Sequence, residues 1–223
     1  MNLNLETYSK DGRKPIGELC ESFTSLVHDG WIFEEIVVSK REREEKILEY
    51  PIISLRTFNS GDALYLISGI HGEEPAGPNA IAEGINYIRK VGRQMPVVLL
   101  PLCNPLGYIS NWRYPRVEKW EEGKDDSVGD SEHLLLNDLK NPRKLKPKND
   151  ECNALTKHIL ELSRNYKPFL TIDLHEDDLL HEGGYIYANS DGESKVAKKI
   201  IDILSTKVPI KRGGLTRFTE LNE

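Results

Sequence analysis

Three short apolar runs, each followed at once by polar residues, constrain the fold of this chain most strongly. They are "DALYLISGI" at residues 62–70, "PVVLLPLC" at 96–103 and "FLTIDL" at 169–174. Each is as long as a strand and mostly apolar, as is typical of strands covered on both faces of a sheet. Segments with helical periodicity separate them, at 78–90 and 152–166. This order predicts an α/β, three-layer domain with a mixed, largely parallel sheet flanked by helices.

The segments around this frame are less regular. Apolar positions three and four residues apart predict helices over 14–28 and 193–207. The long segment 104–150 has no regular pattern, and a loop of that length in a compact domain is usually functional or disordered. Shorter strand-like pieces predict a hairpin from 32–39 and 50–58, a strand over 184–190 and another near 215–221.

Charge and cysteine content exclude several classes of protein. The formal net charge of −6 at pH 7 argues against a general nucleic-acid binder. No apolar stretch reaches the roughly 18–20 residues of a membrane span, and the N-terminal "MNLNLETYSKDGRK" does not resemble a signal peptide. The three cysteines form no C-x-x-C pair, which favours a reducing compartment. We therefore expect a cytoplasmic protein with neither a nucleic-acid nor a membrane partner; the sequence does not indicate its oligomeric state.

Residues that can bind a metal directly follow the apolar runs. His71 and Glu74 follow the first run, Asn104 the second and His175 the third. Ligands of open α/β sheets bind beyond the carboxyl ends of the strands, so these side chains are expected at one edge. Catalytic zinc often takes two histidines and one carboxylate and keeps a position for water. The pattern therefore favours a zinc site at His71, Glu74 and His175; the alternative is a metal-free set of acidic turns.

Three motifs in order resemble those of the zinc metallocarboxypeptidase superfamily. This superfamily includes carboxypeptidase A-like peptidases and deacylases of the succinylglutamate desuccinylase and aspartoacylase type. "HGEE" is similar to its H-x-x-E zinc motif, "CNPLGY" to its N-P-x-G stretch and "FLTIDLHED" to the strand that ends in its second zinc histidine. The resemblance implies one Zn²⁺ per chain, and a peptide or an acylated amino acid as the substrate of amide hydrolysis.

The resemblance also implies catalytic roles. In the family, zinc polarises the scissile carbonyl and lowers the pKa of a bound water. A glutamate moves the water proton to the leaving amine, and an arginine stabilises the oxyanion. Arg113 and Arg116, in "NWRYPR", are the candidates for that arginine. We prefer Arg113 because Trp112 and Tyr114 flank it.

Residues 128–135, "VGDSEHLL", depart from the family pattern. The family has a D-x-N-R stretch there, which holds the terminal carboxylate of the substrate. Glu132 and His133 stand where Asn and Arg are expected, and one carboxylate does not hold another at neutral pH. A simple exopeptidase is therefore not expected, and Glu132 either favours a cationic substrate group or caps a loop. The candidate substrate-binding residues are Asn104, Arg116, Glu132 and His133.

The position of the catalytic glutamate is a second departure. In the family it lies on a strand well beyond the second zinc histidine, whereas this chain ends soon after His175. Glu220, in "RFTELNE", loosely resembles the T-x-E of that strand. Either Glu220 is the base in a minimal single domain over 1–223, or the base is absent. In the second case, which we favour, the domain lacks its closing elements and is truncated, completed by a partner chain or inactive.

Residues next to the ligands have simpler interpretations. Asp173 alternates onto the same strand face as His175, and either hydrogen-bonds it or is a satisfied core acid. We expect Glu73 to face solvent and Glu176 to lie in an acidic turn or add negative potential to the rim. Cys103 is expected to be a small core residue rather than a nucleophile.

Three functions remain open from the sequence. The first is a zinc-dependent amide hydrolase, either a metallocarboxypeptidase-like peptidase or an N-acyl amino acid deacylase. The second is a catalytically impaired zinc-binding protein of the same fold that binds a peptide or partner. The third is a metal-free α/β domain.

Overall fold

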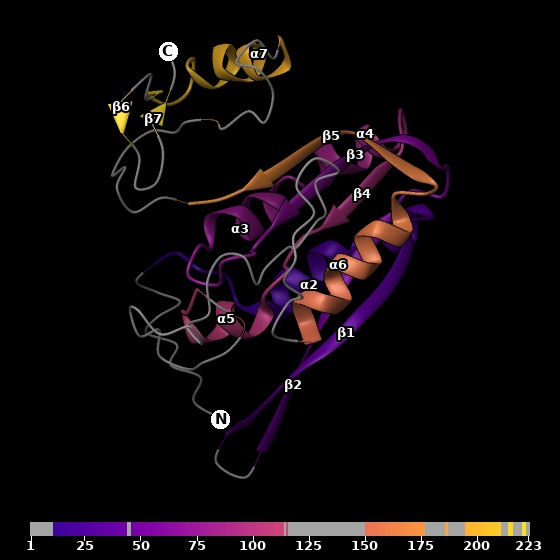
Figure 1. Ribbon diagram of the computed structural model, residues 1–223, viewed down its shortest axis with the longest axis vertical. Helices are drawn as coiled ribbons and strands as arrows, with labels where there is room; N and C mark the ends of the chain where they lie inside the picture. Colours follow the sequence, from indigo (N-terminus) through magenta and orange to yellow (C-terminus); the bar gives the residue numbers. More distant parts are fainter. Residues whose placement is uncertain are drawn as a thin grey trace. The chain divides into compact units, whose positions relative to one another are not determined.

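A five-stranded mixed sheet is the centre of the computed structural model (Figure 1). The structure describes residues 11–43, 46–113, 115, 150–176, 186, 195–210, 214–215 and 220–221. It divides into two compact units, Met1–Glu176 and Asp177–Glu223. The five-stranded sheet belongs to the first unit.

The sheet has the strand order β1-β2-β4-β3-β5. β1 pairs with β2 and β2 with β4 in antiparallel fashion, whereas β3 is parallel to both β4 and β5. Only β2 therefore runs against the other four strands, which fits a mixed, largely parallel sheet. The strands are β1 (Ile32–Arg43), β2 (Lys46–Arg56), β3 (Gly61–Ser68), β4 (Val97–Leu100) and β5 (Tyr166–Leu174).

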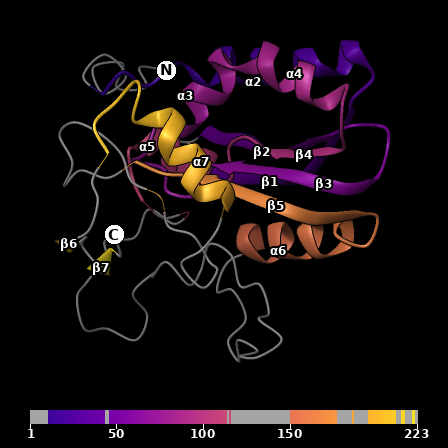
Figure 2. The same cartoon turned by 90° about the horizontal axis from the view of Figure 1, so that it is seen from above.

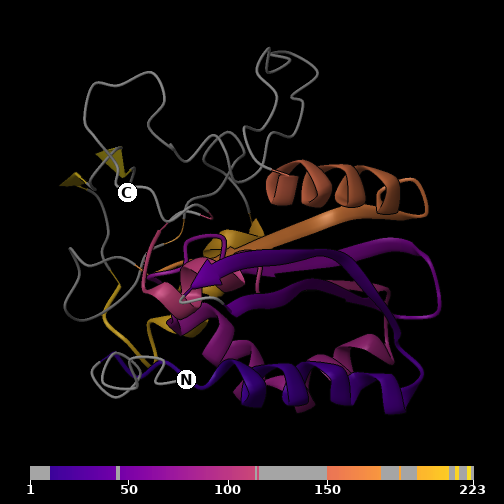
Figure 3. The same cartoon turned by 90° about the horizontal axis from the view of Figure 1, so that it is seen from below.

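Helices cover both faces of this sheet, as Figures 2 and 3 show. One face carries α2 (Ile16–Thr24), the 3₁₀ helix η1 (Ser25–Asp29), α3 (Ala76–Glu83) and α4 (Ile85–Gly92). The opposite face carries α6 (Asp150–Leu162), and the short α5 (Pro105–Ser110) follows β4.

The continuous apolar run of β4 is explained by this three-layer arrangement. Val97 and Leu99 belong to the core under α2, α3 and α4, whereas Val98 and Leu100 belong to the core under α6. All four side chains are fully buried. Since successive residues of a strand point to opposite faces, only a strand covered on both sides can bury all of them.

The predicted α/β class and its helix-flanked, largely parallel sheet are confirmed, and so is the hairpin, which β1 and β2 form. The strand at 169–174 differs from expectation in its burial. Within β5 only Tyr166 is buried, and Phe169 is 58% exposed. β5 is one of the two edge strands of the described sheet, whereas β4 lies inside it. The strand predicted at 184–190 lies outside the described residues, apart from residue 186.

The second unit contains a helix and a short strand pair. α7 (Lys195–Leu204) has no buried residue, and β6 (Gly214–Leu215) pairs with β7 (Glu220–Leu221) in antiparallel fashion. No helix in the described part of the chain is long and apolar enough to cross a membrane.

Candidate functional site

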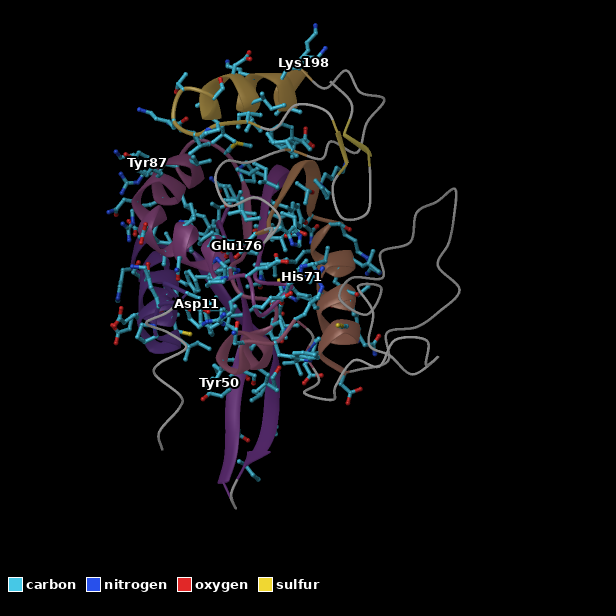
Figure 4. The ribbon with its side chains drawn as sticks, turned by 90° about the vertical axis from the view of Figure 1, so that its left-hand side faces the viewer. Asp11, Tyr50, His71, Tyr87, Glu176 and Lys198 are labelled. Carbon is cyan, nitrogen blue, oxygen red and sulfur yellow. The ribbon has the colours of Figure 1, made fainter. Side chains whose placement is uncertain are left out.

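The parallel pairing of β3 and β5 brings two predicted metal-binding segments together. Ser68, the last residue of β3, pairs with Leu174, the last residue of β5. The chain therefore leaves both strands at the same edge, with His71 and Glu74 following β3 and His175 following β5. Figure 4 shows His71 and Glu176 in this part of the molecule.

One potential ligand atom from each of His71, Glu74 and His175 lies within 4.8 Å of the others. Nδ1 of His71 is 2.7 Å from Oε1 of Glu74, and Nδ1 of His175 is 2.9 Å from Oε2 of Glu74. The two Nδ1 atoms are 3.2 Å apart. The side chains of His71 and Glu74 are each 10% exposed, whereas the His175 side chain is 41% exposed. The cluster is therefore buried at His71 and Glu74 and accessible to solvent at His175.

The spacing of these atoms suits a small metal ion. Zinc binds nitrogen and oxygen ligands at about 2.0–2.2 Å, so neighbouring ligands of a tetrahedral ion lie about 3.3 Å apart. The three distances in the cluster approach that value. The donor set, two imidazoles and a carboxylate, is one that catalytic zinc uses. The residues present therefore fit such an ion.

Asp173 and Glu176, which flank His175, hold the cluster in place. Oδ2 of Asp173 lies 3.1 Å from Nε2 of His175, so Nε2 donates to Asp173 and Nδ1 faces the cluster. The backbone N–H of Glu176 donates to Oε2 of Glu74 at 3.1 Å, and its carboxylate accepts the N–H of Ala76, the first residue of α3. The backbone and the side chain of Glu176 thus connect the end of β5 to Glu74 and to the start of α3.

The electrostatics keep Glu74 ionised. Burial raises the pKa of Glu74, but hydrogen bonds and charge interactions with His175 and His71 outweigh it and lower this pKa to about 2. Burial lowers the pKa of His175, but hydrogen bonds to Asp173 and Glu74, with their charges, raise it to about 10. In the metal-free protein His175 is therefore an imidazolium at neutral pH.

Arg113 lies beside the cluster. Its Nη1 donates to Oε1 of Glu73 at 2.9 Å and to Oε1 of Glu74 at 3.1 Å. Glu73, expected to face solvent, is only about one-third exposed (34%), and its Oε2 is buried without a partner among the described residues. Glu73 therefore helps to hold Arg113, a role that the H-x-x-E spacing does not reveal.

Asn104 occupies a buried position behind the cluster. Its Oδ1 accepts the N–H of Gly107 and caps α5, and its Nδ2 donates to the carbonyl of Arg113 at 3.0 Å. The same carbonyl accepts the N–H of Gly72. Asn104 and Gly72 thus fix the backbone of Arg113, and a substrate-binding role of Asn104 stays a prediction.

Gly72 leaves no room for a side chain. A Cβ there would lie 2.1 Å from the carbonyl carbon of Gly107 and 2.3 Å from the carbonyl oxygen of Trp112. We expect Gly72→Ala to destabilise the protein by about 1–3 kcal/mol, because backbone must move to relieve such overpacking. Urea unfolding measures this. Gly17→Ala in α2, where a Cβ meets nothing within 4 Å, is the control and is expected to be neutral or slightly stabilising; equal behaviour of the two variants would contradict the expectation.

The sequence also predicts site roles for Arg116, Glu132, His133 and Glu220. Arg116, Glu132 and His133 lie outside the described residues. Glu220 is the first residue of β7 in the second unit, so its role as a base stays a prediction. Cys103 is buried, and burial raises the pKa of its thiol well above the ordinary value, in keeping with a core residue.

Comparison with known proteins identifies the fold. No family model and no curated protein matches the chain. Among solved structures it resembles a candidate metallopeptidase of Shewanella amazonensis, with a TM-score of 0.63 and 18% identity over 92% of this chain and 72% of the other. A candidate metallopeptidase of Shewanella baltica also has a TM-score of 0.63, with 20% identity over 92% and 70%. Bovine thrombin-activatable fibrinolysis inhibitor has a TM-score of 0.50, with 17% identity over 92% and 69%.

These likenesses show the fold that the three sequence motifs suggested. The chain shares its α/β fold with the two candidate metallopeptidases and with thrombin-activatable fibrinolysis inhibitor. Its His-Glu-His cluster lies at the carboxyl ends of the parallel strands, where ligands bind in open α/β sheets.

Proposed function

We propose that this protein is a zinc-dependent hydrolase of an amide bond, either a metallocarboxypeptidase-like peptidase or an N-acyl amino acid deacylase. The convergence of Nδ1 of His71, Nδ1 of His175 and the Glu74 carboxylate supports this proposal most strongly. These three residues would hold one Zn²⁺ per chain. The bound ion would supply Lewis-acid chemistry, polarising the substrate carbonyl and lowering the pKa of a water molecule.

The residues around the cluster have separate tasks in this proposal. Asp173 accepts the Nε2 proton of His175 and so leaves Nδ1 to act as a ligand. The backbone N–H of Glu176 orients the Glu74 carboxylate. The guanidinium of Arg113, held by Glu73, would stabilise negative charge that develops on the carbonyl oxygen of the substrate.

The proposed hydrolysis also needs a general base. Glu220 is our candidate to take a proton from water at its carboxylate and deliver it to the leaving amine. If the chain lacks a base, it is a catalytically impaired zinc-binding protein of the same fold.

The proposed substrate is a peptide or an acylated amino acid. Thrombin-activatable fibrinolysis inhibitor, which shares the fold, has been solved with tick carboxypeptidase inhibitor. We propose that Arg116, Glu132 and His133 contribute to substrate binding, and that Glu132 favours a cationic group. A comparison of Lys- and Glu-containing substrates tests this preference.

Hydrolysis of a panel of short peptides and acylated amino acids tests the function. We expect zinc-dependent turnover by the wild type that chelation abolishes and His71→Ala eliminates. Loss of turnover in Glu220→Gln with unchanged zinc content would identify the base. If the wild type binds zinc but is as inert as His71→Ala, the impaired zinc-binding alternative replaces the enzyme.

Zinc uptake is expected to release about one proton from His175 at pH 8. An imidazole with the ordinary pKa of about 6.5 is already neutral at this pH, whereas a pKa of about 10 keeps His175 protonated. The ion and the Nδ1 proton compete for the same lone pair. Titration calorimetry in buffers of different ionisation enthalpy measures the release. Asp173→Asn removes a partner that raises this pKa and should release less; equal release by both proteins would contradict the assignment.

A further inference from the structure

Arg13, which the sequence motifs do not include, is a buried arginine with a complete set of partners. Its side chain is 0% exposed. Nε and Nη2 donate to the Asp11 carboxylate at 2.9 and 2.8 Å, and Nη2 also donates to Oδ1 of Asn111 at 2.8 Å. Nη1 donates to the backbone carbonyl oxygens of Gly72, at 2.9 Å, and Tyr108. All five N–H groups of the guanidinium are thus used.

Apart from Asp11, these partners belong to the segment that carries His71 and Glu74 and to the segment that leads to Arg113. Gly72 lies between His71 and Glu74, and its N–H donates to the carbonyl of Arg113. Tyr108 lies in α5, and Asn111 ends that helix with a left-handed backbone (φ 49°), two residues before Arg113. Arg13 therefore holds the metal-ligand segment and the Arg113 segment at a fixed separation.

The surrounding packing also holds the Arg13 segment itself. The Arg13 guanidinium lies over the Tyr108 ring, 4.6 Å from its centroid. The Tyr108 hydroxyl donates to the carbonyl of Lys14, and Asn79 of α3 donates to the carbonyl of Gly12. Residues 11–14 are thus bound to both α3 and α5, and Figure 4 shows Asp11 in the same region as His71 and Glu176.

We infer that Arg13 is a positioning residue for the metal centre, acting through Gly72 on His71 and Glu74 and through α5 and Asn111 on Arg113. This inference rests on the proposed function, because it concerns the same metal. An arginine is required at this position. The ammonium group of lysine has three donors on one nitrogen and cannot reach all the acceptors that surround the planar guanidinium. The positioning should strengthen zinc binding about tenfold, the lower end of the range for residues that orient metal ligands.

Zinc dissociation constants from competition with a chromophoric chelator test the inference. Arg13→Lys and Arg13→Ala are expected to bind zinc about tenfold more weakly than the wild type. Arg56→Ala is the matched control: Arg56 is largely buried (17% exposed) and paired with Glu34 away from the cluster, so its loss should leave zinc affinity unchanged within about twofold. Guanidinium at about 20 mM should restore the affinity of Arg13→Ala, whereas urea at the same concentration should not, because only the cation reproduces the donors.

The outcomes separate this inference from the proposed function. Weakened binding in Arg13→Lys with guanidinium rescue of Arg13→Ala supports the inference; if Arg13→Ala does not fold, the lysine variant decides. Wild-type zinc binding with an unchanged dissociation constant in Arg13→Lys overturns the inference and leaves the function standing. Absence of zinc binding in the wild type overturns both.

Discussion

Glu74→Gln is expected to lower zinc affinity by at least about 100-fold. The glutamine keeps the size of the side chain but replaces an anionic ligand by a weakly coordinating amide. Loss of a direct ligand should exceed the 10–100-fold cost of losing an outer partner. The substitution also removes a negative charge from the site, because the pKa of about 2 keeps Glu74 ionised across the whole working range of pH.

Chelator competition and metal content after dialysis measure this effect. Glu49→Gln is the matched control, since Glu49 is about half exposed (52%) and pairs only with Lys40 among the described residues. The control should retain about one zinc per chain. Retention of one zinc by Glu74→Gln with wild-type affinity would show that the carboxylate is not a ligand.

Arg113→Ala is expected to lower kcat by about 10²–10³-fold, the cost of removing one donor to a developing oxyanion. This expectation rests on the proposed hydrolysis. Arg113 lies next to Glu74, and its backbone carbonyl is fixed by Asn104 and Gly72. Its position is therefore set by the same segments that carry the metal ligands.

A kcat and KM comparison on the best substrate of the panel tests the role of Arg113. Arg93→Ala is the control, because Arg93 is 68% exposed and pairs with Asp29 on the surface. Arg113→Ala should bind zinc within about tenfold of the wild type. The lower kcat of this variant is then not caused by loss of the metal. A raised KM with unchanged kcat would instead assign Arg113 to ground-state substrate binding.

The sequence predicts the central strands well because their burial leaves a local signal. β4 is apolar on successive residues since both of its faces are covered, and the run at 96–103 shows this directly. The run at 169–174 in β5 is also rich in apolar residues, but Phe169 is exposed and none of its residues is buried. Burial depends on what lies beside a strand, which the composition of that strand does not contain.

The sequence likewise predicts part of the candidate site and misses another part. His71, Glu74 and His175 follow strand ends, and the parallel pairing of β3 and β5 brings such residues together. Arg13 gives no comparable signal, because its partners at Gly72 and Tyr108 are backbone carbonyls that lie 59 and 95 residues away. A buried arginine is recognised only once the path of the chain is known.

The most direct test of the central claim is an anomalous difference map from crystals of the zinc-loaded protein, with data collected above and below the zinc edge. We predict one strong peak per chain, about 2.0–2.2 Å from Nδ1 of His71, Nδ1 of His175 and a carboxylate oxygen of Glu74. A peak at other residues, or no peak in protein soaked with excess zinc, would contradict the account.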